Sequence, residues 1–593
     1  MESYISKSVA WWEESQLRFL VLCSLFLQYL LFFAAPLRKF NVPSWFRFLT
    51  WLAYIGGDAI AIYALATLFN RHKQGCAATH FNSSSIEVVW APILLMHLGG
   101  QDGITAYNIE DNELWMRHVL TALSQIAVAM YVFWKSWTWP KEQALWKTSL
   151  LAFGPGILKC FEKPWALKNA SITSLTTMLG SAENGGEINS LEAYVQAARH
   201  LHQNNPPDGD DVDRKPYALF VDIVYSYDDR LTNLGYMLRN KDEAYGLVQS
   251  GLSSTFDRLY TKERVFKYKP DYCGPTRLVV NRARIGTLLR YVVAYLSLQA
   301  IREFLKGDYH TGYNADDVLV TNILLWGTTA LEYLIANVRP FLECFCIAFP
   351  QPWPRQVAQY NIIGYIARNR RRRELWTMKP SSSSRTITSL VYDHIDRGWG
   401  QYIEGTATYI VFNDSRGQRT LLEREGHPEL LVHLLGRPFD ETVLLWHLAT
   451  DFCFYSMEAK DEVEEVSRCS RHISNYLVYL LFVNPEMLMT GTRSTLFKSV
   501  YGDLKRMVQQ LDAGEDERGI TARIVEQLLI PPAPGEGGGG LVSDAFGLAE
   551  ALTGAGMEAG ATWRIIQGVW VEMLCFSASR CRGETCKSFT GFQ

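Results

Sequence analysis

The sequence contains none of the compact motifs that mark a reaction centre. It has no nucleophile elbow, no glycine-rich phosphate-binding loop, and no cluster of histidines and cysteines at metal-ligand spacing. The 11 cysteines are scattered, and Cys575, Cys581 and Cys586 lack the paired spacing of a zinc site. These absences exclude the enzyme and metal-site classes that a motif would define, so no catalytic residue, metal or cofactor is expected.

Two further absences concern targeting and the cysteines. No cleavable signal peptide is evident, because the first apolar run is too long for a signal core, Glu13 and Glu14 precede it, and no small-residue cleavage site follows. That run is expected to remain as a membrane anchor. No disulfide framework is expected either, because most cysteines fall in regions predicted to face the cytosol, where thiols stay reduced.

What the sequence does contain is a set of long apolar runs, although a net charge of -3 and a mean hydropathy near zero conceal them. About 20 helical residues cross a bilayer core, and a lipid-facing backbone has to hydrogen-bond within itself. The chain is therefore predicted to be mainly α-helical, a polytopic membrane bundle of about six spans with helical cytosolic regions. The predicted spans are residues 17–35, 48–69, 86–98, 114–134, 288–305 and 318–338.

Two short runs leave the number of spans open. Residues 86–98 are brief for a span, and a re-entrant or interfacial segment is the usual alternative at that length. Residues 341–349 are too short to cross and are expected at the interface or under the last helix, with a seventh span as the alternative.

The orientation is predicted from the lysines and arginines of the short loops, which collect on the cytosolic side. A cytosolic N-terminus fits this rule better, and both long polar regions and the C-terminus then share the cytosol. The residues assigned to the cytosol are Lys7, Arg71, Lys73, Lys135, Lys141, Lys147, Arg282, Arg284, Arg290, Arg339 and Arg355, against Arg38, Lys39, Arg47 and Lys306 on the far side. The membrane is expected to be the plasma membrane or an endomembrane.

Composition divides the chain into membrane and polar regions. The predicted order is a four-span region at 1–139, a cytosolic helical region at 140–287, a two-span region at 288–349, a cytosolic helical domain at 350–530, a Pro/Gly linker at 531–540 and terminal helices at 541–593. Both cytosolic regions show helical periodicity, without a convincing strand ladder.

Four segments carry a resemblance to a known family. They are LLMHLGGQDGITAYNIEDNELWMRH at 94–118, FGPGILK at 153–159, VLLWHLATD at 443–451 and NYLVYLLFVNPEML at 475–488. The first two resemble the plant membrane family that carries the domain of unknown function numbered 4220, and the last two resemble its companion C-terminal domain, numbered 594. The resemblance implies an integral membrane protein of plants with several N-terminal spans and no established activity or substrate. Relatives usually continue beyond Arg582 and Gly583 into a further segment, so the tail of this chain is expected to diverge from the family.

Ionisable residues inside predicted spans are the first candidates for chemistry, because an unpaired charge in hydrocarbon is costly. Asp58 follows two glycines in the middle of the second span, Glu332 lies within the sixth, and His97 closes the third. They could form a proton or cation pathway, or they could make interhelical hydrogen bonds that only hold the bundle together. The acidic loop from Asp102 to Glu113 could bind a divalent cation through oxygen ligands, and a solvated turn is the alternative.

Residues next to the last span are candidates for membrane contact. Cys344 and Cys346 follow that span, where acylation is reasonable, and burial as small apolar residues is the alternative. Arg368 and Arg370 to Arg373 form a basic run, for which contact with anionic lipid and simple solvation are both reasonable.

Three functions of different classes remain open. A membrane-anchored interaction or regulatory protein is favoured, because much of the chain is polar helix without a reaction centre; its partners would be the bilayer and other proteins, and no nucleic acid. An ion or small-solute transporter or channel would use Asp58, His97 and Glu332. A membrane-embedded enzyme would use His97 or His447, and it ranks last because neither histidine has a nucleophile or metal partner. His447 and Asp451 share a helical face, which suits a general base and its partner or an ordinary intrahelical hydrogen bond.

Overall fold

The computed structural model describes residues 2–39, 42–74, 84–108, 110–135, 143–171, 188–204, 227–239, 241–262, 277–307, 309, 313–338, 353, 355–370, 378–424, 428–457, 461–489, 491–508, 515–530, 540–554 and 558–580. Within these ranges every regular element is a helix, and one isolated bridge pairs the backbones of Val357 and Ser381. The described part of the chain is therefore mainly α-helical, as predicted. It forms two compact units, here called unit 1 and unit 2.

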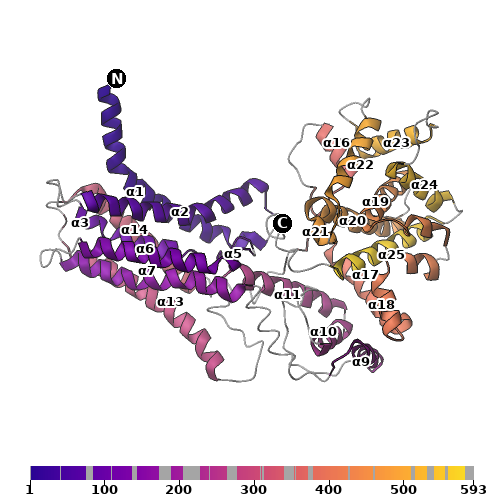
Figure 1. Cartoon of the computed structure of the whole chain (residues 1–593), viewed down its shortest axis with the longest axis horizontal. Helices are drawn as coiled ribbons and strands as arrows, with labels where there is room; N and C mark the ends of the chain where they lie inside the picture. Colours follow the sequence, from indigo (N-terminus) through magenta and orange to yellow (C-terminus); the bar gives the residue numbers. More distant parts are fainter. Residues whose placement is uncertain are drawn as a thin grey trace. The chain divides into compact units, whose positions relative to one another are not determined.

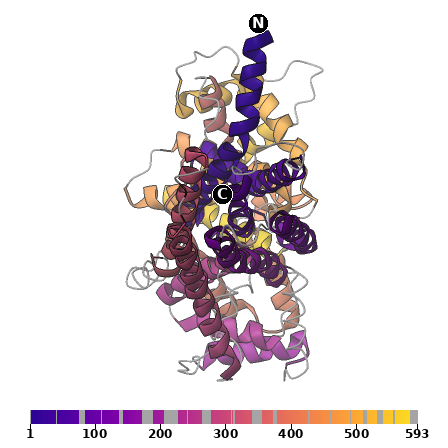
Figure 2. The same ribbon diagram turned by 90° about the vertical axis from the view of Figure 1, so that its left-hand side faces the viewer.

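Unit 1 comprises Met1–Met178, Asp213–Pro216 and Ser250–Trp353. Its described elements are α1 (Glu2–Ala34), η1 (Pro36–Lys39), α2 (Ser44–Gln74), α3 (Ser84–Glu87), α4 (Trp90–Leu98), α5 (Glu110–Glu113), α6 (Trp115–Lys135), α7 (Gln143–Ala170), the second half of α11 (Lys241–Tyr260), α13 (Arg277–Phe304), α14 (Ala315–Tyr333) and η3 (Leu334–Val338). The long helices α1, α2, α6, α7, α13 and α14 are labelled in Figure 1, and the turned view in Figure 2 shows the indigo and purple ones gathered in one bundle.

Four described helices of unit 1 are long and apolar enough to cross a membrane: Ser15–Lys39, Trp45–His72, Trp115–Lys135 and Ala315–Asn337. Their outer faces are apolar, as lipid contact requires. On α1, Phe19, Phe26 and Phe33 are spaced seven residues apart and each is more than three-fifths exposed. Such a stripe would be a liability in water and is expected against hydrocarbon chains.

The other two predicted spans differ from this pattern. Residues 86–98 form the short α3 and the nine-residue α4, every residue of which is buried inside unit 1. Residues 288–305 belong to α13, a 28-residue helix that also carries charged residues such as Arg290 and Arg302, so it lacks a long enough apolar window.

Helix α7 was not predicted as a span, and the structure groups it with unit 1. It packs along α4, α6 and α13. Gly156 permits the close approach to α4, because a Cβ atom there would lie 2.9 Å from the Pro92 carbonyl oxygen. Gly99 does the same at the end of α4, where a Cβ atom would lie 2.5 Å from the Cβ of Lys159. The sequence prediction had placed this stretch in the first cytosolic region.

Unit 2 combines Leu179–Val212 and Tyr217–Gln249 with Pro354–Gln593. Its described elements are α9 (Leu191–Gln203), α10 (Tyr227–Arg239), the first half of α11, α16 (Ile362–Arg370), α17 (Ser384–Arg397), η4 (Gly398–Tyr402), α18 (Thr406–Asp414), η5 (Thr420–Arg424), η6 (Pro428–His433), α19 (Phe439–Ser456), α20 (Asp461–Val483), α21 (Pro485–Leu488), α22 (Ser494–Met507), α23 (Glu517–Leu528), α24 (Leu541–Gly554) and α25 (Ala559–Ala578). The helical periodicity predicted for the two polar regions corresponds to elements such as α9, α19 and α20.

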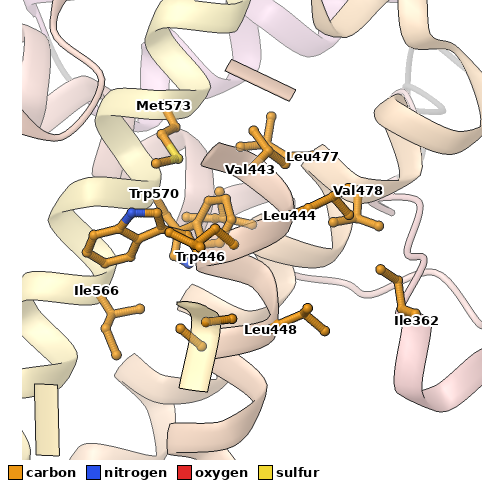
Figure 3. Packing of buried hydrophobic residues seen from close by; sticks show 14 of the residues in the cluster. Ile362, Val443, Leu444, Trp446, Leu448, Leu477, Val478, Ile566, Trp570 and Met573 are labelled. Atoms are coloured by element: carbon orange, nitrogen blue, oxygen red, sulfur yellow. The ribbon is translucent and has the colours of Figure 1, made fainter. Parts of the chain in front are cut away.

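The core of unit 2 is built around α19, which is apolar on nearly all sides and buried along most of its length. Helices α20, α24 and α25 pack against it. Figure 3 shows Trp446 of α19 beside Trp570 of α25, with Leu477 and Val478 of α20 in the same cluster. The Trp570 indole Nε1 donates to Thr450 Oγ1 at 3.0 Å, so this large side chain is buried without losing its hydrogen bond.

Candidate functional site

The three intramembrane candidates, Asp58, His97 and Glu332, do not contact one another in unit 1; each has its own partners. His97, at the end of α4, lies between α1 and α14. Its Nδ1 is 2.9 Å from Ser24 Oγ and its Nε2 is 3.1 Å from Thr328 Oγ1. Because a hydroxyl can donate or accept, either tautomer of the ring is satisfied.

Asp58 and Glu332 are each paired with a lysine of α7. Lys163 Nζ lies 2.5 Å from an oxygen of Asp58 on α2, and Lys159 Nζ donates to Glu332 on α14. The side chains of Lys159 and Glu332 are 6% and 7% exposed, so this pair is buried on both sides. Because the lysines are one helical turn apart, α7 neutralises a charge on each of two neighbouring helices.

Lys262, just after α11, caps the C-terminal end of α4. Its Nζ donates to the Gly99 carbonyl at 2.8 Å and lies 3.7 Å from Asp102 and 3.6 Å from Glu162. Carbonyls at a helix C-terminus carry partial negative charge, so they favour a cation at this place. Gly100 adopts a left-handed φ of +67°, which lets the chain turn away beneath the ammonium group. Burial lowers the pKa of Lys262 to about 8, and the nearby carboxylate of Glu162 opposes that shift.

These pairs form an electrically balanced group, here called the charge cluster. Asp102, beside Lys262, also accepts from Arg290 on α13. The charge cluster consists of four carboxylates and four cations: Asp58, Asp102, Glu162 and Glu332 with Lys159, Lys163, Lys262 and Arg290. Removing one partner of such a buried pair is costly, because it leaves an uncompensated charge. The arrangement can therefore hold six segments of unit 1 together in one register: α2, the loop after α4, α7, the end of α11, α13 and α14.

In the loop after α4, which the sequence suggests as a cation site, two of the acidic residues have protein partners. Asp102 is bound by Arg290 and Lys262, and Asp111 accepts the backbone N–H groups of Tyr107 and Asn108. Among the described residues, no group of three or more histidine, cysteine, aspartate or glutamate side chains is arranged to hold a metal ion.

His447 of unit 2 is buried and hydrogen-bonded at both ring nitrogens. Nε2 accepts the N–H of Ile362 at 3.5 Å, so Nδ1 carries the proton and donates to Ser474 Oγ at 2.8 Å. The distance from His447 Nε2 to Asp451 Oδ2 is 3.8 Å, which is too long for a hydrogen bond. In this geometry Asp451 neither accepts an intrahelical hydrogen bond from His447 nor orients it as a general base. The ring is a neutral link between α16, α19 and α20.

Asp451 belongs to a separate polar network within unit 2. Asn361 Nδ2 donates to one of its oxygens at 2.5 Å and Arg471 Nε donates to the other at 2.8 Å. Arg471 also reaches Glu517 at 2.9 Å and Tyr455 at 2.6 Å. The network joins α16, α19, α20 and α23, so it positions helices and leaves no free base.

The burial of His447 predicts an acid-sensitive unit 2. Burial lowers the pKa of His447 to about 4, whereas the unfolded chain takes up a proton below about 6.5. Unfolding therefore binds a proton in this window, and stability is fully present above pH 6.5 and decreases as the pH falls to 4. We expect a loss of about 3 kcal/mol, measured by denaturant unfolding at several pH values. A His447→Gln variant should show a shallower slope; equal slopes would contradict this assignment.

Glu572 on α25 holds a turn of unit 2 in place, and it is not among the residues predicted from the sequence. It is 3% exposed, and its carboxylate accepts the N–H groups of Gly417 and Thr420, each at 2.8 Å. The hydroxyls of Thr420, at 2.7 Å, and of Ser415 also donate to it. Its position inside the apolar run GVWVEMLCF was the available signal, since a buried charge needs partners.

Other predicted residues fall partly outside the described ranges. Cys344, Cys346 and residues 371–373 lie outside them, and of Arg370 only the backbone is described. Arg368 is described: its Nε donates to the Gly364 carbonyl at 2.9 Å, and its guanidinium lies 3.9 Å from Glu517. This arginine therefore takes part in the packing of α16 and α23.

Apolar helices long enough to cross a bilayer, exposed phenylalanines and inward-facing paired charges define a helical membrane protein. The chain belongs to the family described as "Domain of unknown function (DUF4220)", whose model matches residues 51–403, more than half of the sequence. A second model, described as "Protein of unknown function, DUF594", matches residues 556–588, which include Glu572. Both domains named from the sequence are thereby confirmed, although the segments 443–451 and 475–488 lie outside the matched residues. No curated protein and no solved structure matches the chain.

Proposed function

We propose that this protein is a membrane-anchored interaction or regulatory protein, in which unit 1 fixes the helical unit 2 at a multi-pass membrane anchor. The observation that carries the proposal is the pairing of Asp58 and Glu332 with Lys163 and Lys159. These paired charges stabilise the helix bundle, so their presence inside unit 1 is explained without a transported or reacting substrate. The partners of unit 2 are then other proteins, and the bilayer is the partner of unit 1.

The membrane-proximal residues extend this proposal. Arg370 to Arg373 form a basic run in the stretch that follows the last apolar helix, α14, and each basic residue near an anionic surface adds about 1 kcal/mol of attraction. Acylation of Cys344 or Cys346 would add a second attachment to the membrane. A plant source, and a plasma-membrane or endomembrane location, are expected on the family resemblance.

The proposal predicts that captured partners depend on unit 2. Full-length chain and a chain ending at Val338 are expressed at equal levels, cross-linked in intact membranes and purified by the same N-terminal tag. Specific partner proteins are expected with the full-length chain and are lost with the shorter one, while both remain in the membrane fraction. An unchanged partner set would contradict the proposal.

A transporter or channel is the second candidate, and one observation favours it. Helix α4 ends in the interior of unit 1, and broken helices beside intramembrane charges build the ion sites of many transporters. Here, however, the ammonium of Lys262 occupies the place of the cation. In planar bilayers under cation and proton gradients, we expect no current from wild type or Asp58→Asn. A wild-type current lost in Asp58→Asn would favour transport instead. An enzyme using His97 or His447 has the least support, because both ring nitrogens of each are engaged.

A further inference from the structure

We infer that unit 1 crosses the membrane seven times, so that residues before Ser15 and residues after Val338 lie on opposite sides. This arrangement differs from the predicted one, in which both termini face the cytosol. It is independent of what unit 2 binds, and it states on which side of the membrane, relative to the N-terminus, unit 2 is presented. The inference follows from the direction of each helix between two ends of unit 1, called the Arg18 end and the Trp115 end.

Helices α1, α4 and α14 run in the same direction, from the Arg18 end to the Trp115 end. Arg18 near the start of the α1 span binds Asp317 at the start of α14 at 2.6 Å, and further along, the Tyr29 hydroxyl donates to the Gly327 carbonyl at 2.8 Å. Helix α4 follows α14 in parallel. Its Trp90 Nε1 donates to Thr321 Oγ1 at 2.8 Å, and seven residues later His97 reaches Thr328.

The short α4 still carries the chain to the Trp115 end, because the loop after it continues in the same direction. A Cβ atom on Gly103 would lie 2.5 Å from the Cβ of Ala35, at the end of α1. Beyond it, Ala106 clusters with Leu167 and Tyr260, and Trp115 packs against that cluster. The chain therefore reaches the end where α6 begins.

Helices α2 and α6 return from the Trp115 end to the Arg18 end. Gln16 of α1 donates to the hydroxyl of Tyr63 at 2.9 Å, whereas Gly57 approaches Leu31, so α2 is antiparallel to α1. Late in both α2 and α6, the rings of Phe69 and Tyr131 are 5.1 Å apart. The two helices are thus parallel to each other.

Helices α7 and α13 supply the two crossings between α6 and α14. Near its start, Thr148 of α7 donates to the Ala300 carbonyl late in α13 at 3.3 Å. At its other end, Lys168 lies 4.9 Å from the ring centre of Trp115, the first residue of α6. Earlier in α13, Arg290 binds Asp102 in the loop at the Trp115 end. Helix α7 therefore runs toward the Trp115 end and α13 runs back from it.

Both helices have the length and the outer surface of a membrane span. Each has 28 residues, about 42 Å at 1.5 Å per residue, against a hydrocarbon core of about 30 Å. Among their charged residues, Lys159, Glu162 and Lys163 of α7 and Arg290 of α13 take part in the charge cluster. The exposed Lys147, Lys168 and Arg302 each lie within five residues of a helix end. Between these ends, large apolar or tyrosine side chains are exposed: Leu150, Leu158, Phe161 and Trp165 on α7, and Leu288, Tyr291, Val292, Tyr295 and Leu298 on α13.

The same contacts explain why the loop charges misdirect a sequence-based orientation. That prediction places Arg290 on the side of Arg71 and places the loop containing Asp102 on the other side. In the structure Arg290 binds Asp102, whereas Arg71 binds Glu87 at the Arg18 end. The additional crossing by α7 places the chain between α7 and α13 on the side opposite to the predicted one. The segments after α13 and after α14 change side with it.

The test compares three epitope tags in the full-length chain: before Met1, within residues 172–187 and after Gln593. Sealed microsomal vesicles, whose cytosolic face is outward, are treated with protease. We expect near-complete loss of either the first tag alone or the other two together, with loss of all three in detergent. As a matched control, one added spanning helix between Gln593 and the last tag should reverse the fate of that tag alone.

Two results would overturn the inference. Equal fates of the first and last tags would mean an even number of crossings. Equal fates of the first and middle tags would mean that an even number of crossings separates them, so that either α4 with its loop or α7 does not cross. Because the first and last tags lie outside every described helix, their comparison holds even if the internal insertion prevents folding.

Discussion

Replacing Glu572 by alanine is expected to lower the free energy of unfolding of unit 2 by about 4 kcal/mol. The carboxylate accepts two backbone N–H groups and two hydroxyls from residues 415–420. Alanine leaves the N–H groups of Gly417 and Thr420 buried without an acceptor, and each orphaned donor costs about 1–3 kcal/mol. Gly417 sits at φ +117°, so this turn cannot easily rearrange to find another partner.

The measurement follows thiol labelling of Cys453 during heating, because that cysteine is buried in the core of unit 2 and reports on unit 2 alone. The expected loss corresponds to a midpoint about 10 °C lower. Glu572→Gln should be milder, since one amide oxygen still accepts. Glu550→Ala, on the exposed face of α24, is the matched control and should change the midpoint little. A Glu572→Ala midpoint close to that of the control would contradict the assigned role.

Replacing Lys159 by methionine is expected to destabilise unit 1 by about 3–5 kcal/mol, whereas the double variant Lys159→Met with Glu332→Leu should recover most of that loss. The single variant leaves the carboxylate of Glu332 buried without its cation. The double variant removes both charges and fills their space with apolar atoms, which is often neutral or favourable. The difference separates a packing pair from a pair retained for transport.

Thermal unfolding in nanodiscs measures these changes, and the exposed pair Lys306 and Glu303 supplies the control. Its cation is 57% exposed, so Lys306→Met should cost less than about 1 kcal/mol. A double variant as unstable as Lys159→Met would show that the pair stabilises unit 1 in a way that apolar packing cannot replace. That result would also weaken the anchor proposal, which rests on these charges being structural.

The apolar helices could be predicted from the sequence, because the four structural spans are long runs with few charges. Helix α7 could not, because Lys159, Glu162 and Lys163 interrupt its apolar residues. Their partners lie 105 residues before Lys163, at Asp58, and 173 residues after Lys159, at Glu332. Sequence alone gives the cost of each charge and does not reveal which distant residue offsets it.

The candidate site could be predicted only in part, because sequence shows which polar residues lie in apolar runs and does not show their distant partners. Asp58, His97 and Glu332 can be recognised from the sequence as polar residues in apolar runs, and each has a polar partner in unit 1. Their common membership of a pathway stays a prediction; in unit 1, Asp58 and Glu332 pair with lysines of α7, and His97 bonds to α1 and α14. In unit 2, the four-residue spacing of His447 and Asp451 suggested a mutual contact. Ile362 and Arg471, far away in the sequence, take up the groups instead.

The composition of unit 2 from two separated stretches has a consequence for biogenesis. Residues 188–249 leave the ribosome before α13 and α14, yet they pack with residues beyond 354; Tyr194, for example, packs against Trp399 in an edge-to-face contact. At 5–20 residues per second, the first stretch waits roughly 5–20 s for its other half. In the seven-crossing arrangement inferred above, both α13 and α14 have to be inserted in that interval, because a single failed crossing would leave the two stretches on different sides of the membrane. Unit 2 can therefore be completed only after both helices have been inserted correctly. Until then, apolar residues that become buried in unit 2, such as Tyr194 and Val195, are exposed to chaperones and quality-control factors.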